Sequence, residues 1–431
     1  MLSRPSPAPA EAPAALPRAG TRSFLFLLGP CSPFQARLAP ALEAEGHRVV
    51  KVLLHAGDAL FWRRPALHYR GGLDAWQDHV GRLMDEHGTT DLVVHNESRE
   101  YHRLAILEAR RRGIRVLVFE MGYFRPDWIT FERDGLSALS HFPRDPALVR
   151  ALAAEAPEPD FSVRFRTPFL RFALNDLAYH LGEVFGTPLY PRYRRYAIDN
   201  PVVEYLLWGR KLLTRRRPEA AAAAVVEKLE AGAAPWYVLP LQLSGDFQIR
   251  AHSPFPDMPA AMRAVVASFG RHAPAAARLV VKLHPLDNLR TPWAKLVAEA
   301  AAEAGAAGRV DCIDGGDLAR LIAGSEGVVT VNSTVGIAAI QAGRPTIALG
   351  GAVFDIPGLT FQDGLDRFWA GRRPPDRDLA SAFVRALVHT TQIRGDYYTE
   401  PGMAAAVQGV VERLKAGLPD LPERIARMRS A

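Results

Sequence analysis

Two stretches of the chain alternate short apolar runs with longer amphipathic segments. A continuous apolar run bounded by glycine, proline or charged residues predicts a buried strand, whereas apolar residues spaced three and four apart predict a helix. Strands that alternate with helices of about 10–15 residues are typical of a parallel sheet with helices on its faces. In the first stretch we expect strands at 23–29, 49–54, 92–94 and 114–119, and helices at 34–45, 73–87 and 101–112.

The second stretch follows an alanine-rich helix expected at 218–231 and repeats this order of strands and helices without repeating the sequence. The predicted fold class is therefore α/β, with two Rossmann-like domains facing a cleft, as in the glycosyltransferase-B type of architecture. Such a fold does not by itself establish a function. The expected strands are 236–241, 279–283, 310–313, 328–331 and 346–349, and the expected helices are 257–270, 292–304, 317–323 and 335–342.

Changes in composition set the expected domain boundaries. Residues 146–218 are punctuated by proline and rich in arginine and tyrosine, with helical patches expected at 167–185 and 202–213. The expected parts are a disordered tail at 1–21, an N-terminal Rossmann-like domain at 22–145, a helical connector at 146–231, a C-terminal Rossmann-like domain at 232–400 and C-terminal helices at 401–431.

The charge balance favours an anionic partner. The 431 residues carry a net charge of +7, almost all of the positive charge comes from arginine, and no recognised nucleic-acid module is present. The two cysteines, Cys31 and Cys312, are too few for a disulfide framework or a four-cysteine zinc site, which favours a reducing compartment. No run of about 18 apolar residues predicts a membrane span. We therefore expect a cytoplasmic protein, peripheral to a membrane, whose basic and aromatic segment 190–196 either docks on an anionic surface or is simply solvated.

The stretch 117–137 carries two acids at the ends of two apolar segments. Glu120 follows the expected strand 114–119, and Glu132 follows a short extended run at 128–131. Chemistry in α/β folds lies just beyond the carboxyl ends of strands, so both acids are candidates for catalysis. The pattern leaves open a polar loop whose acids pair with neighbouring arginines.

Three expected strand ends in the second stretch carry polar residues suited to an anionic ligand. Alternate residues of an extended segment point the same way, a lysine and a histidine two apart suit a phosphate, and a helix start offers backbone N–H groups. Each motif also has an ordinary explanation as a polar loop or a helix cap. The residues are Gln242, Ser244 and Asp246 at the first strand end, Lys282, His284 and Pro285 at the second, and Asn332, Ser333 and Thr334 at the third.

No metal site is predicted. Asp376 and Asp378 have an Asp-x-Asp spacing, but they lie in a loop rich in proline and arginine. We expect no cofactor.

Taken together, these motifs resemble those of the capsular polysaccharide β-Kdo transferases of the KpsS/LipB type, over nearly the whole chain after residue 22. No single motif is specific, but their combination is. The shared motifs are Gly-Pro-x-Ser-Pro-Phe at 29–34, Ala-Gly-Asp at 56–58, Asn-Glu-Ser-Arg-Glu-Tyr-His at 96–102, Phe-Glu-x-Gly-Tyr-x-Arg-Pro-Asp-x-Ile-Thr-x-Glu at 119–132, Gln-Leu-x-x-Asp at 242–246, Lys-x-His-Pro at 282–285 and Asn-Ser-Thr-x-Gly at 332–336.

The resemblance implies a transferase that moves Kdo from CMP-Kdo to a (lyso)phosphatidylglycerol-type lipid at the cytoplasmic membrane face. If CMP-β-Kdo yields a β-linked product, configuration is retained. Because CMP carries a single phosphate, we expect cationic side chains and helix N–H groups to stabilise it without a metal ion. The resemblance also implies an acceptor and catalytic role for the N-terminal domain and CMP-sugar binding for the C-terminal one, with His284, Ser333 and Thr334 on the CMP phosphate. We expect Glu132 to be the nucleophile and Glu120 its acid/base partner, with Asp246 as the rival. The alternatives are a transferase or epimerase of the same fold acting on a UDP-sugar, or a non-catalytic scaffold in a capsule biosynthesis and export complex.

Overall fold

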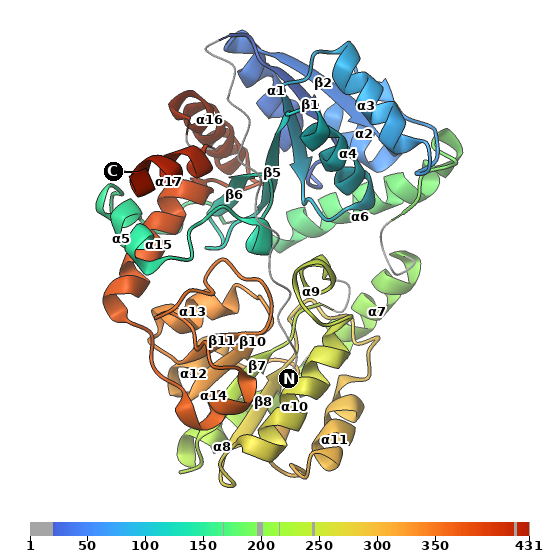
Figure 1. The fold of residues 1–431 in the computed structure, drawn as a ribbon. Helices are drawn as coiled ribbons and strands as arrows, with labels where there is room; N and C mark the ends of the chain where they lie inside the picture. Colours follow the sequence, from blue (N-terminus) through green and yellow to red (C-terminus); the bar gives the residue numbers. More distant parts are fainter. Residues whose placement is uncertain are drawn as a thin grey trace. The chain divides into compact units, whose positions relative to one another are not determined.

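The computed structural model describes residues 20–166, 168–195, 201–214, 216–243, 246–417 and 420–430. These residues form two compact units, each built around its own sheet (Figure 1). The seven-stranded unit contains 20–142, 156–195 and 385–430, and the five-stranded unit contains 143–155 and 201–384.

The seven-stranded sheet has the order β12-β6-β5-β4-β1-β2-β3. Strands β1 to β5 are parallel, and β6 and β12 extend one edge in antiparallel pairing. The strands are β1 Ser23–Phe26, β2 Arg48–Leu53, β3 Leu67–His68, β4 Asp91–His95, β5 Arg115–Met121, β6 Trp128–Arg133 and β12 Gln392–Arg394. The helices are α1 Phe34–Ala44, α2 Ala56–Trp62, α3 Trp76–Glu86, α4 Glu100–Arg111, α6 Phe169–Phe185, α16 Glu400–Ala416 and α17 Leu421–Ser430.

The five-stranded sheet is entirely parallel, with the order β11-β10-β7-β8-β9. Its strands are β7 Trp236–Pro240, β8 Arg278–Lys282, β9 Val310–Ile313, β10 Gly327–Thr330 and β11 Thr346–Ala348. The helices of this unit are α5 Pro146–Ala154, α7 Pro201–Thr214, α8 Arg216–Ala231, α9 Phe247–His252, α10 Met258–His272, α11 Trp293–Glu303, α12 Leu318–Gly324, α13 Val335–Gln341 and α14 Leu365–Gly371, and α15 Arg377–Thr391 leads back to the other unit.

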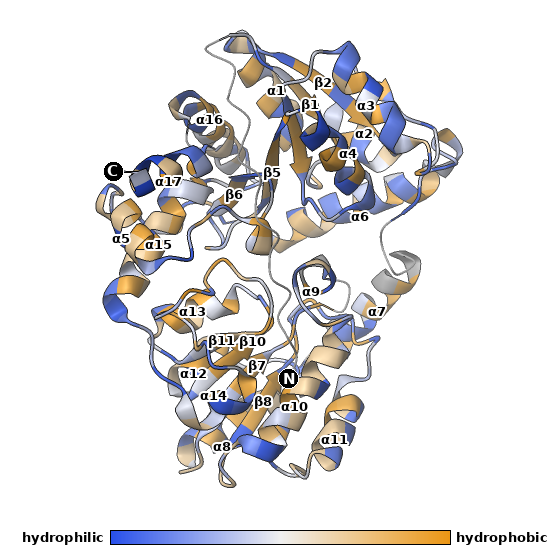
Figure 2. Cartoon of the chain, viewed as in Figure 1, coloured by the Kyte–Doolittle hydropathy of each residue, from blue (hydrophilic) through white to orange (hydrophobic). Residues whose placement is uncertain are grey.

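Both sheets are buried on two faces, which explains the continuous apolar runs in the sequence. In β5, Val116 and Val118 belong to one core, whereas Leu117 and Phe119 belong to the core on the opposite face. Figure 2 shows hydrophobic strands flanked by helices that are hydrophobic on one side and hydrophilic on the other. Among the described residues, no helix is both long and apolar enough to span a bilayer.

The parallel strands of both units follow the same order. Counted within each unit, that order is 3-2-1-4-5, which is the Rossmann arrangement. The prediction of an α/β chain with two Rossmann-like domains is therefore confirmed. In this arrangement the strand order reverses at one point, between β1 and β4 in one unit and between β7 and β10 in the other. Ligands of such folds bind beyond the carboxyl ends of the strands at that point.

The chain passes between the units more often than the expected domain boundaries imply. The expected connector at 146–231 is divided, since 146–155 and 201–231 belong to the five-stranded unit and 156–195 to the seven-stranded unit. The expected C-terminal helices also return to the seven-stranded unit, where α16 packs on α1 (Figure 1). The expected tail at 1–21 lies almost wholly outside the described residues.

Candidate functional site

Two of the three predicted donor-side motifs meet where the strand order of the five-stranded sheet reverses. Gln242 follows β7 and Asn332 follows β10, and both side chains are buried. The Gln242 side chain donates a hydrogen bond to Asn332 Oδ1 at 2.9 Å, and the Asn332 backbone N–H donates to Gln242 Oε1 at 3.3 Å. Gln242 also donates to Asp246 Oδ2 at 3.1 Å. These hydrogen bonds lie at the carboxyl ends of β7 and β10, which is where ligands of such folds bind.

Ser333 and Thr334 lie at the same edge, immediately before α13. The Ser333 backbone N–H donates to Thr330 Oγ1 at 3.1 Å, and the Ser333 hydroxyl accepts from the Val335 N–H at 3.3 Å. Thr334 occupies the cap position without a side-chain cap hydrogen bond. Both hydroxyl groups are half-buried and follow Asn332 directly in the chain. The Ser333 hydroxyl stabilises a short local turn and does not cap the helix. Ser244 lies outside the described residues.

His284 is held in one tautomer by its own loop. Its Nδ1 accepts a hydrogen bond from the Leu286 backbone N–H at 3.0 Å. A neutral imidazole whose Nδ1 accepts a hydrogen bond carries its proton on Nε2. Asp287 anchors the rest of the loop after Pro285, because it accepts from the Leu289 N–H at 2.7 Å and from Trp293 Nε1 at 3.0 Å.

Two lysines lie next to the loop that carries His284 and Asp287. Lys282 ends β8 and is buried, and burial lowers the pKa of its ammonium group, partly offset by Asp314. Lys211, from α7, donates to the carbonyl oxygens of Pro285 and Asp287 at 3.2 and 2.8 Å and pairs with Asp314 at 3.1 Å. Lys211 is not among the residues predicted from the sequence, because nothing near it points to a loop more than 70 residues later.

The two predicted catalytic acids lie on one face of the antiparallel pair β5–β6 but differ in exposure. Glu120 pairs with Thr130, and Glu132 pairs with Val118. Residues directly opposite each other, and residues two apart on one strand, share a face. The Glu120 side chain is 26% exposed, whereas Glu132 is 5% exposed.

Glu120 is a partly accessible carboxylate at the carboxyl ends of β4 and β5. Asn96 Nδ2 donates to its Oε2 at 3.1 Å, and the Met121 N–H donates to its Oε1 at 2.9 Å. His95 Nε2 lies 4.0 Å from the same carboxylate. Burial lowers the pKa of His95 to about 4, so this imidazole is neutral at pH 7. Glu120 is thus held in place while one side remains open to solvent.

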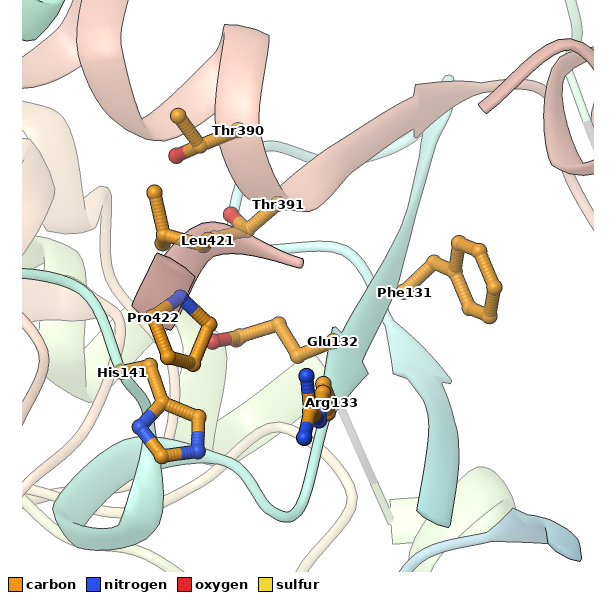
Figure 3. A pocket seen from close by; sticks show the side chains of 8 residues that line it. All are labelled: Phe131, Glu132, Arg133, His141, Thr390, Thr391, Leu421 and Pro422. Carbon is orange, nitrogen blue, oxygen red and sulfur yellow. The ribbon is translucent and has the colours of Figure 1, made fainter. Parts of the chain in front are cut away.

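Glu132, which the sequence led us to expect as the nucleophile, is a buried interior carboxyl group. Tyr123 donates a hydrogen bond to its Oε1 at 3.1 Å, and Ser140 donates to its Oε2. Burial raises the pKa of Glu132 to about 8, which outweighs the opposing effect of these two hydrogen bonds. Figure 3 shows Glu132 pointing into a pocket closed by Leu421 and Pro422, while Phe131 lies on the other side of β6. The cavity is about 10 Å³, enough for about one water molecule.

A buried ion pair joins two further motifs of the seven-stranded unit. Lys51 lies 2.7 Å from Asp58 and donates to Leu27 O and Gln35 Oε1 at 2.7 and 2.8 Å. Asp58 also accepts from the Gly29 N–H at 3.4 Å. The pair therefore ties the loop after β1 to the start of α2. Lys51 is not among the residues predicted from the sequence, because it lies within an expected strand.

The described residues contain no group of three or more histidine, cysteine or acidic side chains that could hold a metal ion. Asp376 instead pairs with Arg150 at 2.7 Å and caps the start of α15.

Comparisons with known proteins identify relatives over most of the chain. A family model described as capsule polysaccharide biosynthesis protein matches residues 90–398. The capsule polysaccharide modification protein LipB of Neisseria meningitidis serogroup B is 30% identical over 388 residues, covering 88% of this chain and 92% of the relative. The capsule polysaccharide export protein KpsS of Escherichia coli is 31% identical over 381 residues, covering 88% and 97%. Among solved structures, the β-Kdo 2,7 transferase of Thermosulfurimonas dismutans KpsC is 15% identical with a TM-score of 0.45, covering 91% of this chain and 99% of that one.

Proposed function

Because this chain belongs to the capsule polysaccharide biosynthesis protein family, we propose that it is a glycosyltransferase acting in capsule synthesis. In this proposal it transfers Kdo from CMP-Kdo to a (lyso)phosphatidylglycerol-type lipid, with retention of configuration and without a metal ion. The observation that carries the proposal is that the predicted donor-side motifs follow three neighbouring strands, β7, β8 and β10, of the five-stranded sheet, and that Gln242 and Asn332 are in direct contact there.

The five-stranded unit would bind the CMP part of the donor. The Nε2–H of His284 and the hydroxyls of Ser333 and Thr334 are donors suited to a phosphate oxygen, and Lys282 adds positive charge. CMP carries a single phosphate, so such donors can stabilise it as a leaving group without a cation. Gln242 and Asn332 would shape the same edge through their mutual hydrogen bonds.

The seven-stranded unit would supply the reacting carboxylate, and its geometry favours Glu120 over Glu132 for that role. A nucleophile must be ionised and reachable by its substrate. Glu120 is partly exposed, whereas Glu132 is buried with its pKa raised to about 8. We therefore assign Glu120 as the nucleophile and Glu132 as a positioning residue that acts through Tyr123 and Ser140. Asp246 orients Gln242 on the donor side.

Retention would follow from two displacements. A Glu120 oxygen attacks the anomeric carbon of Kdo while the bond to the CMP phosphate oxygen breaks, which gives a glycosyl ester and free CMP. The acceptor hydroxyl then attacks the same carbon, loses its proton to a base and releases the Glu120 carboxylate. Each displacement inverts the centre, so the product keeps the donor's configuration.

The proposed setting is the inner face of the cytoplasmic membrane, where a lipid acceptor would be available and other capsule biosynthesis and export proteins would act. The test is incubation of the protein with CMP-Kdo and lysophosphatidylglycerol, followed by mass spectrometry of the lipid. A gain of one or more Kdo masses, with release of CMP, is the expected result. Release of UDP from a UDP-sugar would contradict the proposal. So would a protein that restores capsule in cells when Glu120 and His284 are both replaced, because a scaffold needs neither group.

A further inference from the structure

Helix α6 has an apolar face that its own unit does not cover. Leu170, Leu174, Leu181 and Phe185 are all exposed, and we call them the α6 stripe; Leu170 is 68% and Phe185 76% exposed. Their spacing of four, seven and four residues places them along one side of the helix. Phe169, which is 60% exposed, extends the apolar surface at the N-terminal end. Figure 2 shows hydrophobic residues recurring along α6.

The opposite side of α6 is fixed to the seven-stranded unit. Tyr179 and Glu183 on that side are buried, and the Tyr179 ring packs against His55 at 4.9 Å. Gly182 lies so close to α2 that a Cβ there would stand 2.9 Å from Gly57 Cα. The helix cannot rotate to bury the stripe without losing these contacts.

The charge around the stripe is positive. Residues 161–195 contain six arginines and two acids, and both acids, Asp176 and Glu183, form ion pairs with His180. The exposed arginines lie at both ends of the helix: Arg164, Arg166 and Arg171 at one end, and Arg192 and Arg194 at the other. Part of this charge is balanced by acids outside the segment, because Arg164 pairs with Asp160 at 2.6 Å, Arg171 with Glu400 at 3.7 Å and Arg194 with Glu100 at 3.7 Å. These three pairs are exposed, and arginines still outnumber acids along the segment. An apolar face bordered by arginines suits the boundary between anionic headgroups and acyl chains.

In the segment expected to dock on a membrane, 190–196, the two described tyrosines do not provide this apolar surface. Tyr190 is buried with its hydroxyl 2.6 Å from His68, and Tyr193 stacks on Tyr101 at 5.3 Å between ring centres. Tyr196 lies outside the described residues. Among the described residues of that segment, Pro191, Arg192 and Arg194 are exposed. The exposed leucines and phenylalanines of this surface come from α6.

We propose that the α6 stripe is the surface by which this protein docks on an anionic lipid bilayer, with the flanking arginines on the headgroups. The proposal rests on the proposed function only in its expectation of a lipid acceptor. It does not depend on which carboxylate reacts or on the donor sugar.

The test compares the wild-type chain with the variant Leu170→Ser/Leu174→Ser/Phe185→Ser in flotation assays. The vesicles consist of phosphatidylcholine with or without phosphatidylglycerol. The wild type is expected to float with the anionic vesicles, and the variant to float at least about tenfold less, because the inserted apolar area is lost. Arg192→Ala/Arg194→Ala is expected to reduce the phosphatidylglycerol-dependent part, as is about 0.5 M salt. The matched control is Leu107→Ser, which removes a 39% exposed leucine of α4 in the same unit and should leave flotation unchanged.

Undiminished flotation of the triple variant would overturn the proposal. So would a lower melting temperature or a changed oligomeric state of the variant in the absence of vesicles, since the stripe would then pack within the chain or against a second copy. Transfer to a short-chain, water-soluble acceptor keeps the two proposals separate. If the wild type floats through the stripe but transfers no Kdo, the proposed function alone is refuted. If the triple variant transfers Kdo normally to the soluble acceptor but does not float, the docking surface is supported.

Discussion

Replacing Glu132 by glutamine distinguishes an interior carboxyl group from a reacting one. The folded protein raises the pKa of Glu132 from 4.5 to about 8, chiefly through burial. Between these values the folded state holds a proton that the unfolded state has released, so stability is greatest below about pH 4.5 and falls as the pH rises towards 8. One proton of difference corresponds to ~1.4 kcal/mol per pH unit, so the wild type should lose about 2 kcal/mol between pH 6 and pH 8.

This loss of stability is measured by thermal unfolding of the wild type, Glu132→Gln and Glu120→Gln. In the Glu132→Gln variant the side chain is neutral at every pH, so most of the wild-type loss, roughly 4–8 °C in melting temperature between pH 6 and pH 8, should disappear. Glu120→Gln, in which the interior carboxyl group is intact, should keep the wild-type slope. At pH 7 we expect Glu132→Gln to transfer Kdo within about tenfold of the wild-type rate, because glutamine closely matches a protonated glutamate in shape. Glu120→Gln should be slower by at least ~10²-fold with unchanged CMP binding.

The opposite pattern would refute the reasoning. If Glu132→Gln is folded, retains the wild-type pH slope and is inactive while Glu120→Gln turns over normally, then Glu132 is ionised and reacts directly. That result would restore the order that the sequence led us to expect.

Three further predictions concern the donor site and the fold. His284→Ala should weaken CMP binding by ~1.5–3 kcal/mol in calorimetry, the usual contribution of a hydrogen bond to a charged group, and unchanged affinity would rule out a phosphate contact. Turnover should survive EDTA, because Lys282 can supply positive charge to the phosphate and His284 can supply a hydrogen bond. Activity that is lost in EDTA and restored by Mg²⁺ would reveal a metal site. Lys51→Met should destabilise the protein by ~3–5 kcal/mol, because it leaves Asp58 charged and buried. The control Lys415→Met breaks an exposed ion pair with Glu45 and should destabilise the protein by less than ~1 kcal/mol. Similar denaturation midpoints for the two variants would contradict this prediction.

The parallel strands could be predicted because they are buried on both faces. Runs such as 236–241 and 279–281 have no polar face, so their apolar content marks them as strands without knowledge of their neighbours. Strand β12 carries no such signal: it has three residues, Gln392–Arg394, and two of them are polar. It forms only by pairing with β6, where Gln392 Nε2 donates a hydrogen bond to Thr130 Oγ1 at 3.1 Å. These two residues are 262 positions apart in the sequence.

The same contrast between local and distant contacts explains why the sequence predicts that Gln242 and Asn332 lie together but does not predict that Glu132 is buried. Gln242 and Asn332 each follow a strand, and the Rossmann order makes those two strands neighbours, so topology alone brings the residues together. Alternation within β6 likewise fixes the face on which Glu132 lies. Whether that face is open is decided elsewhere, by Ser140 after the hairpin and by Thr391, Leu421 and Pro422 from the returning C-terminal segment. A local pattern therefore predicts the direction of an acid, but only the distant chain determines whether a substrate can reach it.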